Sequence, residues 1–309
     1  MGGDAAVIRL EDKYLVLKSD PITGAVENIG WLAVNIPSND VAVVGAKPQW
    51  ILPVLIMPTS ESGVEVENIM RQIDEAAKDL NIAIVGGHTE FISGIDHPIV
   101  CSFVAAVTGE RILSSADAEP GDLIVLTGGA AIEATAILAS DLQDEVEAVF
   151  GSRFVERAKS FIKRVSVVKG ALEAAKIDGV TAMHDPTEGG IYTALHEMAE
   201  ASNTGLLVFK DRIFMADETR KLCDFYGLDP LGSISSGALL IAVKPTHETP
   251  LLSRLKDVGL KVDVIGEFRE ANFGRKMVDK DGKITNLPLP KTDELWILYE
   301  KITKKKRND

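Results

Sequence analysis

Apolar and polar residues follow two different periods along the first third of the chain. Residues 4–20 read DAAVIRLEDKYLVLKSD, which predicts two short strands joined by a charged turn at residues 11–13. Residues 64–80 place apolar side chains at every third or fourth position, which predicts a helix that packs on one face. The apolar runs QWILPVLIMP, NIAIVGGHTE and PIVCSFVAAVTGE predict further strands. This part of the chain therefore mixes strands with helices.

An apolar helix, predicted over residues 29–46 with a kink at Pro37, contains the carboxylate of Asp40. An ionised Asp buried alone would cost several kcal/mol, so it needs a proton, a hydrogen bond, a cation or a metal. Asp4 and Asp20 stand at the start of the first predicted strand and at the end of the second. Such ends can converge at one edge of an α/β sheet, and converging carboxylates suit a hard cation such as Mg²⁺.

A structural interpretation stays open for each of these aspartates taken alone. Asp4 and Asp20 fit turns, and Asp40 fits a cap after the proline. The three together, one of them inside an apolar helix, favour a metal site. The spacing alone does not establish that they meet.

A second domain is predicted after SSADAEPGD, residues 114–122, a segment with little apolar content that is typical of a linker. We therefore divide the chain into residues 1–112 and 113–309. In the second part, LIVLTGGAAIEATAILA predicts a strand, a glycine turn and a helix. A further helix is predicted around residues 154–176. Strands near residues 206–209, 238–243 and 262–266 complete a mixed sheet. The fold class is α/β, or α+β, in two domains.

The stretch MHDPTEGG, residues 183–190, is the sharpest local signal. Asp185 fits an N-cap, and Pro186 fits the first position of a helix that would start here. The free N–H groups of such a helix would favour a phosphate, although plain capping is far commoner. His184 is either a packed histidine or an acid or base.

The glycine pairs in IVGGHTE and LTGGAAIEA are weaker signals. Neither has the GxGxxG or GxxxxGK[ST] spacing, so a dinucleotide site and a P-loop are not predicted. His88 and Glu90 follow the first pair at a strand end, where ligands gather.

Composition narrows the function classes. The net charge of −13 argues against nucleic-acid binding, and no apolar run reaches the ~20 residues of a membrane span. The start MGGDAAVIRL has no signal segment, so we expect a cytoplasmic protein. Cys101 and Cys223 form no CxxC spacing, and we assign neither a nucleophilic role.

Eight stretches taken in order resemble the aminoimidazole ribonucleotide synthetase superfamily, over nearly the whole chain: GGDAAVI, LKSDP, NIPSNDVAVVGAKPQW, IVGGHTE, PGDLIVLTGG, TAMHDPTEGGIYTALHEMAEAS, GLDPLGSISSGALLIAV and VIGEF. That superfamily also contains thiamine-monophosphate kinase, selenophosphate synthetase and the carbamoyl dehydratase of hydrogenase maturation. The chain is most similar to this last branch, and within it to archaeal synthetase-related proteins.

The resemblance implies a homodimer whose N-terminal domains pair into an intersubunit β-barrel, with a mixed α/β C-terminal domain beside it and ATP and Mg²⁺ between the domains. It also implies the roles of individual residues. Asp185 and His184 would be catalytic. The metal ligands would be Asp4, Asp20, Asp40 and His88, and the nucleotide would contact Asp4, Asp20, Asn39, Gly86, Gly87, Gly189 and Gly190.

Three departures from the family pattern qualify these expectations. Relatives carry a glycine-rich leader before the first Asp, so either a leader lies outside this sequence or nucleotide binding is weakened. His88 stands where several relatives have an acidic ligand, which would shift the metal preference toward softer ions. The chain ends in KKKRND and not in the cysteine that accepts a carbamoyl group, so we do not expect that reaction.

The predicted function is ATP- and Mg²⁺-dependent phosphoryl transfer to an oxygen of a small substrate, of kinase, synthetase or dehydratase type. The alternative is a nucleotide-binding accessory protein, similar to hydrogenase-maturation proteins and without turnover, that acts with a maturation partner protein.

Overall fold

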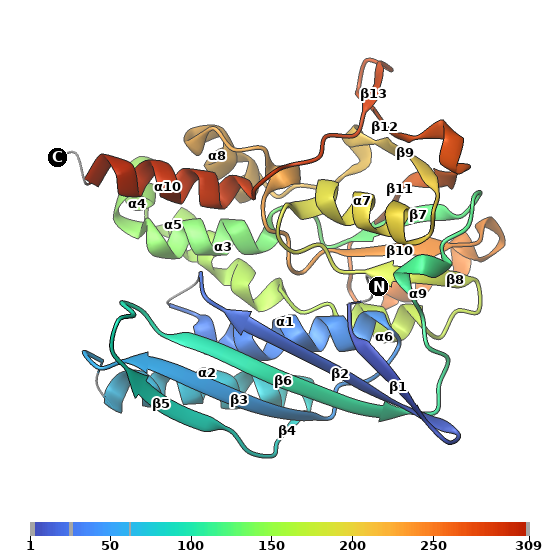
Figure 1. The fold of residues 1–309 in the computed structure, drawn as a ribbon. Coiled ribbons are helices and arrows are strands. Elements are labelled where there is room, and N and C mark those ends of the chain that lie inside the picture. Colours follow the sequence, from blue (N-terminus) through green and yellow to red (C-terminus); the bar gives the residue numbers. More distant parts are fainter. Residues whose placement is uncertain (1–3, 25–26, 62, 307–309) are drawn as a thin grey trace. The chain divides into compact units, whose positions relative to one another are not determined.

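The computed structural model describes residues 4–24, 27–61 and 63–306, which form two compact units (Figure 1). The first unit is Asp4–Ile112, and the second begins at residue 113. Each unit has its own sheet with helices packed on it. The mixed helix and sheet content agrees with the predicted fold class.

The first unit is built on a six-stranded sheet in the order β1-β2-β6-β3-β4, with β5 also paired to β3. The charged turn between β1 and β2 places Glu11 at a φ of 51°, and β4 and β5 pair with β3 in parallel while the other pairs are antiparallel. The strands are β1 (Ala6–Leu10), β2 (Lys13–Ile22), β3 (Trp50–Pro58), β4 (Ala83–Ile84), β5 (His88–Ile92) and β6 (Ile99–Thr108). The strand predicted at NIAIVGGHTE is thus two short strands on either side of the glycines.

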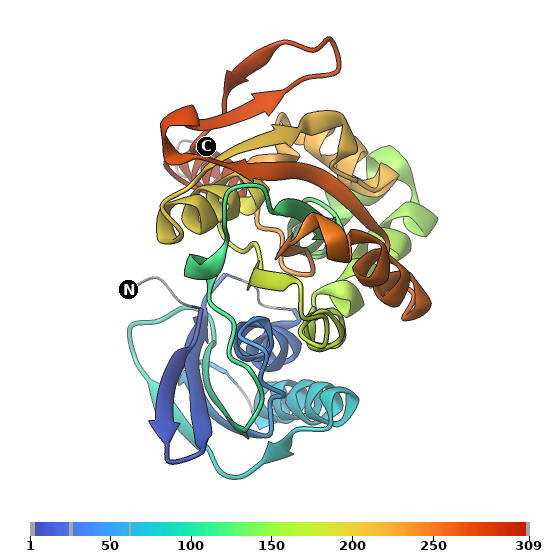
Figure 2. The same cartoon turned by 90° about the vertical axis from the view of Figure 1, so that its right-hand side faces the viewer.

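Two helices, α1 (Ile29–Val43) and α2 (Gly63–Leu80), lie side by side on one face of this sheet (Figures 1 and 2). Every residue of α1 is buried, including Pro37. Only one stripe of α2 is buried, because its charged residues lie on the other side of the helix. We call this side of the sheet the covered face.

The other side of the sheet, the open face, is lined by apolar side chains that alternate with the covered ones along each strand. Ile8, Trp50 and Phe103 are 47%, 38% and 37% exposed on it. Leu52 stands opposite Phe103, and Val54 stands opposite Cys101.

The second unit contains a seven-stranded sheet in the order β13-β12-β9-β11-β7-β10-β8, antiparallel except where β12 pairs with β9. Strand β10, which lies between β7 and the edge strand β8, is buried along its whole length. The strands are β7 (Leu123–Thr127), β8 (Val180–His184), β9 (Gly205–Phe209), β10 (Leu239–Val243), β11 (Val262–Arg269), β12 (Arg275–Val278) and β13 (Ile284–Asn286). The helices are α3 (Ile132–Asp141), α4 (Gln143–Phe150), α5 (Ser152–Lys159), α6 (Val168–Ala174), α7 (Gly190–Ala201), α8 (Asp217–Tyr226), α9 (Glu248–Asp257) and α10 (Glu294–Lys306).

The single helix predicted around residues 154–176 is wrong. The segment divides into α5, a short 3-10 helix (Ser160–Arg164) and α6. Val165 and Val167, which lie in the break, are both buried. A helix with a single buried stripe would direct one of these two valines away from the core, because residues two apart do not share a face of an α-helix. Within the described residues, no helix is both long and apolar enough to cross a membrane.

Gly30 allows α1 to pack closely on α2, and its replacement tests that packing. A Cβ at this position would press on the Ile69 carbonyl oxygen and lie 2.9 Å from Cβ of Gln72. Gly30→Ala should therefore lower the free energy of unfolding by about 1–3 kcal/mol, measured by urea denaturation. Gly63→Ala is the control, because nothing lies within 4 Å of its new Cβ. Equal stability of the two variants would contradict the close helix contact.

Candidate functional site

Strand β2 carries two charged side chains, Lys18 and Asp20, on the covered face. Lys18 pairs in register with Val104 and Asp20 with Ser102, both of which are buried under α1. Residues two apart on a strand point to the same side. The two charges are therefore directed toward the buried helix that contains Asp40.

Asp40 meets one of these charges directly. Its Oδ1 accepts a hydrogen bond of 3.0 Å from Nζ of Lys18, and the two side chains are 8% and 25% exposed. A carboxylate in a helix that is buried on all sides needs such a cation, because desolvation would otherwise neutralise it. Lys18 thus supplies a cation that lets the apolar helix contain an Asp.

The pKa of Asp40 shows that two more carboxylates lie nearby. The pKa of Asp40 is raised from 3.8 to about 7, mainly by burial and in smaller part by the charges of Asp20 and Asp4. Lys18 acts in the opposite direction, through its charge and its hydrogen bond. Asp4 and Asp20 are therefore near enough to Asp40 for their charges to act on it, and we call these three aspartates the carboxylate cluster.

A divalent cation is the predicted partner of the carboxylate cluster. Oδ2 of Asp40 is buried, and no donor among the described residues hydrogen-bonds to it. Asp4 and Asp20 are only partly buried. Carboxylate oxygens are the ligands that Mg²⁺ prefers, and like charges held together need a cation to neutralise them. The identity of these residues as metal ligands stays a prediction.

His88 lies apart from the carboxylate cluster within this unit. It stands on β5 opposite Val54, which points to the open face, whereas Asp20 points to the covered face. Its Nε2 is 4.0 Å from Oε2 of Glu90, and the side chains of His88 and Glu90 are 67% and 63% exposed. Asn39 is buried beside Asp40 in α1, and Gly86 and Gly87 lie in the loop before β5.

The DPTEGG segment of the second unit differs from its prediction. The sequence predicts a helix capped by Asp185, but α7 begins at Gly190, with Gly189 as its N-cap. These two glycines have φ values of 61° and 74°, which favour glycine, so the chain turns through them before the helix starts. Asp185 is 1% exposed and lies before this turn, directly after β8.

A distant carboxylate stabilises the turn in place of Asp185. Oδ2 of Asp293 accepts a hydrogen bond of 2.7 Å from the N–H of Gly189, and its Oδ1 accepts one of 2.9 Å from Leu295. Burial raises the pKa of Asp293 to about 6, although these two hydrogen bonds oppose the rise. Nε1 of Trp296 also donates to Glu188 at 3.3 Å, so the start of α10 holds the DPTEGG turn from two sides.

His184 ends β8 and contacts a carboxylate that the sequence analysis did not single out. Its Nε2 lies 2.8 Å from Oε2 of Glu197, which is on α7. The side chains are 11% and 58% exposed. Glu197 can therefore hold the imidazole ring in one orientation.

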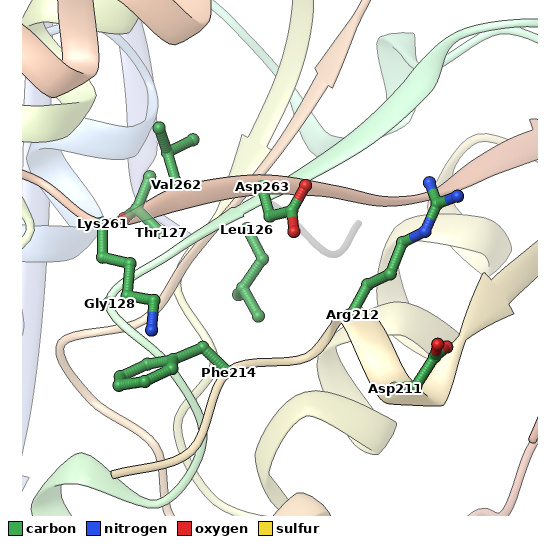
Figure 3. A pocket seen from close by; sticks show the side chains of 10 residues that line it. Leu126, Thr127, Gly128, Asp211, Arg212, Phe214, Lys261, Val262 and Asp263 are labelled. Atoms are coloured by element: carbon green, nitrogen blue, oxygen red, sulfur yellow. The ribbon is translucent and has the colours of Figure 1, made fainter. Parts of the chain in front are cut away.

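A cavity of about 280 Å³ in the second unit is lined by the ends of β7 and β11 and by the segment after β9 (Figure 3). The turn at Gly128 and Gly129 borders it, but their N–H groups donate to the carbonyls of Lys261 and Thr127. Nζ of Lys261 lies over the ring of Phe214, 3.0 Å from its centroid. This glycine turn therefore uses these amides internally and does not present them to a phosphate.

Two family models match the chain. The N-terminal domain of AIR synthase related protein matches residues 2–110, and its C-terminal domain matches residues 119–278. A putative hydrogenase expression/formation protein of Methanocaldococcus jannaschii is 33% identical over 294 residues, which are 89% of this chain and 84% of that protein. Carbamoyl dehydratase HypE of Rhizobium leguminosarum is 25% identical over 292 residues, 91% of this chain and 81% of that protein.

Solved structures share the fold at lower identity. HypE in a complex with HypF is 20% identical, with a TM-score of 0.78 and 93% of each chain covered. HypE in complex with ATP is 21% identical, with a TM-score of 0.77, and covers 91% of this chain and 86% of that one. AaThiL complexed with AMPPCP and TMP is 20% identical, with a TM-score of 0.76, and covers 95% and 91%.

The raised pKa of Asp40 predicts a pH dependence of stability. The folded state holds a proton that the unfolded chain loses above pH 3.8, so this stabilisation is complete below pH 3.8 and is lost as the pH rises through about 7. Compared with Asp40→Asn, the unfolding free energy of the wild type should fall by up to about 4 kcal/mol across this range. Urea denaturation at several pH values, with a chelator present, measures the difference.

Asp12→Asn, which removes a carboxylate from the exposed turn of the same hairpin, is the control for this pH series. Parallel stability profiles of the wild type and Asp40→Asn would show that Asp40 keeps an ordinary pKa in the folded protein.

Proposed function

Because the chain belongs to the AIR synthase related protein family, we propose that it catalyses ATP-dependent phosphoryl transfer to an oxygen of a small substrate. Structural neighbours were solved with ATP and with AMPPCP together with TMP, and HypE relatives are named carbamoyl dehydratases. The bound nucleotides belong to the neighbouring structures and the dehydratase name belongs to the relatives. Both support a nucleotide as the phosphoryl donor of this protein.

The carboxylate cluster is the observation that carries this proposal. Asp4 precedes β1, Asp20 lies on β2 and Asp40 lies in α1, yet the charges of the first two raise the pKa of the third. If these residues served only in turns and caps, their mutual repulsion would bring the fold no benefit. A polyphosphate bound with Mg²⁺ would supply a reason to keep them close.

In this proposal Asp4, Asp20 and Asp40 hold Mg²⁺, and Asn39, Gly86 and Gly87 contribute to nucleotide binding. The bound Mg²⁺ would neutralise phosphate charge. The three carboxylates would hold the ion, and the burial of Asp40 shields its Oδ2 from water.

Asp185 and His184 are the proposed catalytic residues in the second unit. Asp185 would accept a proton from the acceptor or orient it, and His184, held by Glu197, would carry a proton on its ring. Gly189 and Gly190 shape the turn beside them, and Asp293 keeps that turn in place.

We also propose that the active form is a homodimer. The open face of the first sheet exposes apolar residues on neighbouring strands, including Phe103 and Trp50. A sheet that is covered on one side and apolar on the other needs a second layer. The open face of a second copy offers the same apolar chemistry, and two such sheets facing each other would form the barrel that the family resemblance implies.

A second candidate function is a nucleotide-binding accessory protein without turnover. The name of the Methanocaldococcus relative, a putative hydrogenase expression/formation protein, and the complex of HypE with HypF favour it. Such a protein would act through a maturation partner. Release of ADP by the isolated protein with any of a panel of small acids, amides and nucleotides would exclude this candidate.

Calorimetric titration with ATP in the presence of Mg²⁺ tests the leading proposal, and Asp20→Asn tests the role of the cluster. The variant should lower ADP release by at least about a hundredfold, because a carboxylate that fixes the metal is lost. Asp12→Asn, on the exposed turn of the same hairpin, should leave activity unchanged. Absence of ATP binding, with and without Mg²⁺, would rule the proposal out.

Phe103→Glu tests the homodimer. Two buried carboxylates at the centre of the proposed interface would repel each other, so the variant should sediment as a monomer at concentrations where the wild type is a dimer. Val64→Glu places the same charge on α2, where Val64 is 73% exposed, and should not change the oligomeric state. A wild type that sediments as a monomer would contradict the proposal.

A further inference from the structure

Lys18 is a cation in direct contact with Asp40 of the carboxylate cluster. It reaches Asp40 from β2 at 3.0 Å, and its charge lies on the same side of the strand as Asp20. Surface lysines pair with carboxylates that water can also solvate, but Asp40 is 8% exposed. Lys18 is therefore the group that the protein itself supplies to balance a buried negative charge.

Lys18 contacts one of the two oxygens of Asp40, Oδ1. The second oxygen, Oδ2, is buried, and no described donor hydrogen-bonds to it. The negative charges of Asp20 and Asp4 act on the same carboxylate. Asp40 thus meets the chain's own cation through one oxygen and can meet a further positive charge through the other.

An arriving cation meets Lys18 as a competitor. Both carry positive charge, both are attracted by Asp40, and at separations of a few ångströms in a partly buried site their repulsion is strong. Lys18 is a quarter exposed and sits on a flexible four-carbon chain, so its ammonium group can move to another anion. A phosphate group that enters with the cation offers that anion.

Resting on the proposed function, we propose that Lys18 is a resident counter-cation of the carboxylate cluster, which competes with a free divalent cation for Asp40 and yields when the cation arrives bound to a polyphosphate. The protein would then take up the metal together with its nucleotide and bind the free ion weakly. A purely structural ion pair predicts no such selectivity, because its removal would change stability and leave cation affinity as it was.

Titration with Mn²⁺ alone tests this inference, with free Mn²⁺ followed by electron paramagnetic resonance in mildly alkaline buffer that keeps the carboxylates ionised. Lys18→Met should bind free Mn²⁺ at least about tenfold more tightly than the wild type, since one repelling charge is gone. Lys18→Arg, which keeps the charge, should resemble the wild type. Lys13→Met is the matched control, because it removes a lysine from the exposed start of the same strand.

Two further measurements separate competition at Asp40 from a general effect of charge. In Lys18→Met/Asp40→Asn the gain in Mn²⁺ affinity should disappear, because the contested carboxylate is absent. The factor by which ATP strengthens Mn²⁺ binding should be smaller in Lys18→Met than in the wild type. The shift of the thermal unfolding temperature on addition of Mn²⁺ gives a second measure of Mn²⁺ affinity for the single variants. Lys18→Gln replaces Lys18→Met if the latter does not fold.

The outcomes distinguish this inference from the proposed function. If the wild type binds Mn²⁺ with ATP but Lys18→Met binds free Mn²⁺ no better than Lys13→Met does, Lys18 is a structural partner only and the inference is wrong. If neither the wild type nor the variants bind Mn²⁺, with or without ATP, the metal site itself is absent and both proposals fail.

Discussion

The ion pair between Lys18 and Asp40 is the interaction on which the organisation of the first unit depends. A helix buried over its whole length can carry a carboxylate only if a cation or a proton accompanies it. The chain supplies an ammonium group from the neighbouring strand. Even so, burial and the two other aspartates keep the pKa of Asp40 near neutrality, at about 7. The protein therefore retains a partly neutralised negative site in a place where an apolar residue would be more stable.

This constraint links the fold to the proposed chemistry. The sheet brings the end of β2 against α1, and the packing of α1 on α2 fixes the position of Asp40. In the second unit, α10 has the corresponding role, because Asp293 and Trp296 hold the DPTEGG turn that follows Asp185. In both units a residue from a different element holds the residues proposed for function. Rigid elements support a proposed site in this way when its groups must keep their positions during reaction.

The sequence predicted much of this arrangement, and its errors have physical causes. Alternating strands and the amphipathic helix α2 were recognisable because their periods are local. The meeting of Asp4, Asp20 and Asp40 at a metal stays a prediction, although the charges of the first two do act on the third. Lys18 was missed although the signal was present, since a residue two positions before Asp20 on a strand must share its face.

Other features depend on partners that are distant in the chain. The helix start was misplaced because the local pattern after Asp185 satisfies the capping rules, whereas the cap comes from Asp293, 104 residues beyond Gly189. Glu197 was missed because nothing in its own helix marks it as the partner of His184. The most direct measurement of the central claim is the anomalous scattering of Mn²⁺ in crystals grown with MnCl₂ and a non-hydrolysable ATP analogue. The account predicts a Mn²⁺ peak within coordination distance of carboxylate oxygens of Asp20 and Asp40. A peak at unrelated residues, with these carboxylates bound only to protein groups, would contradict it.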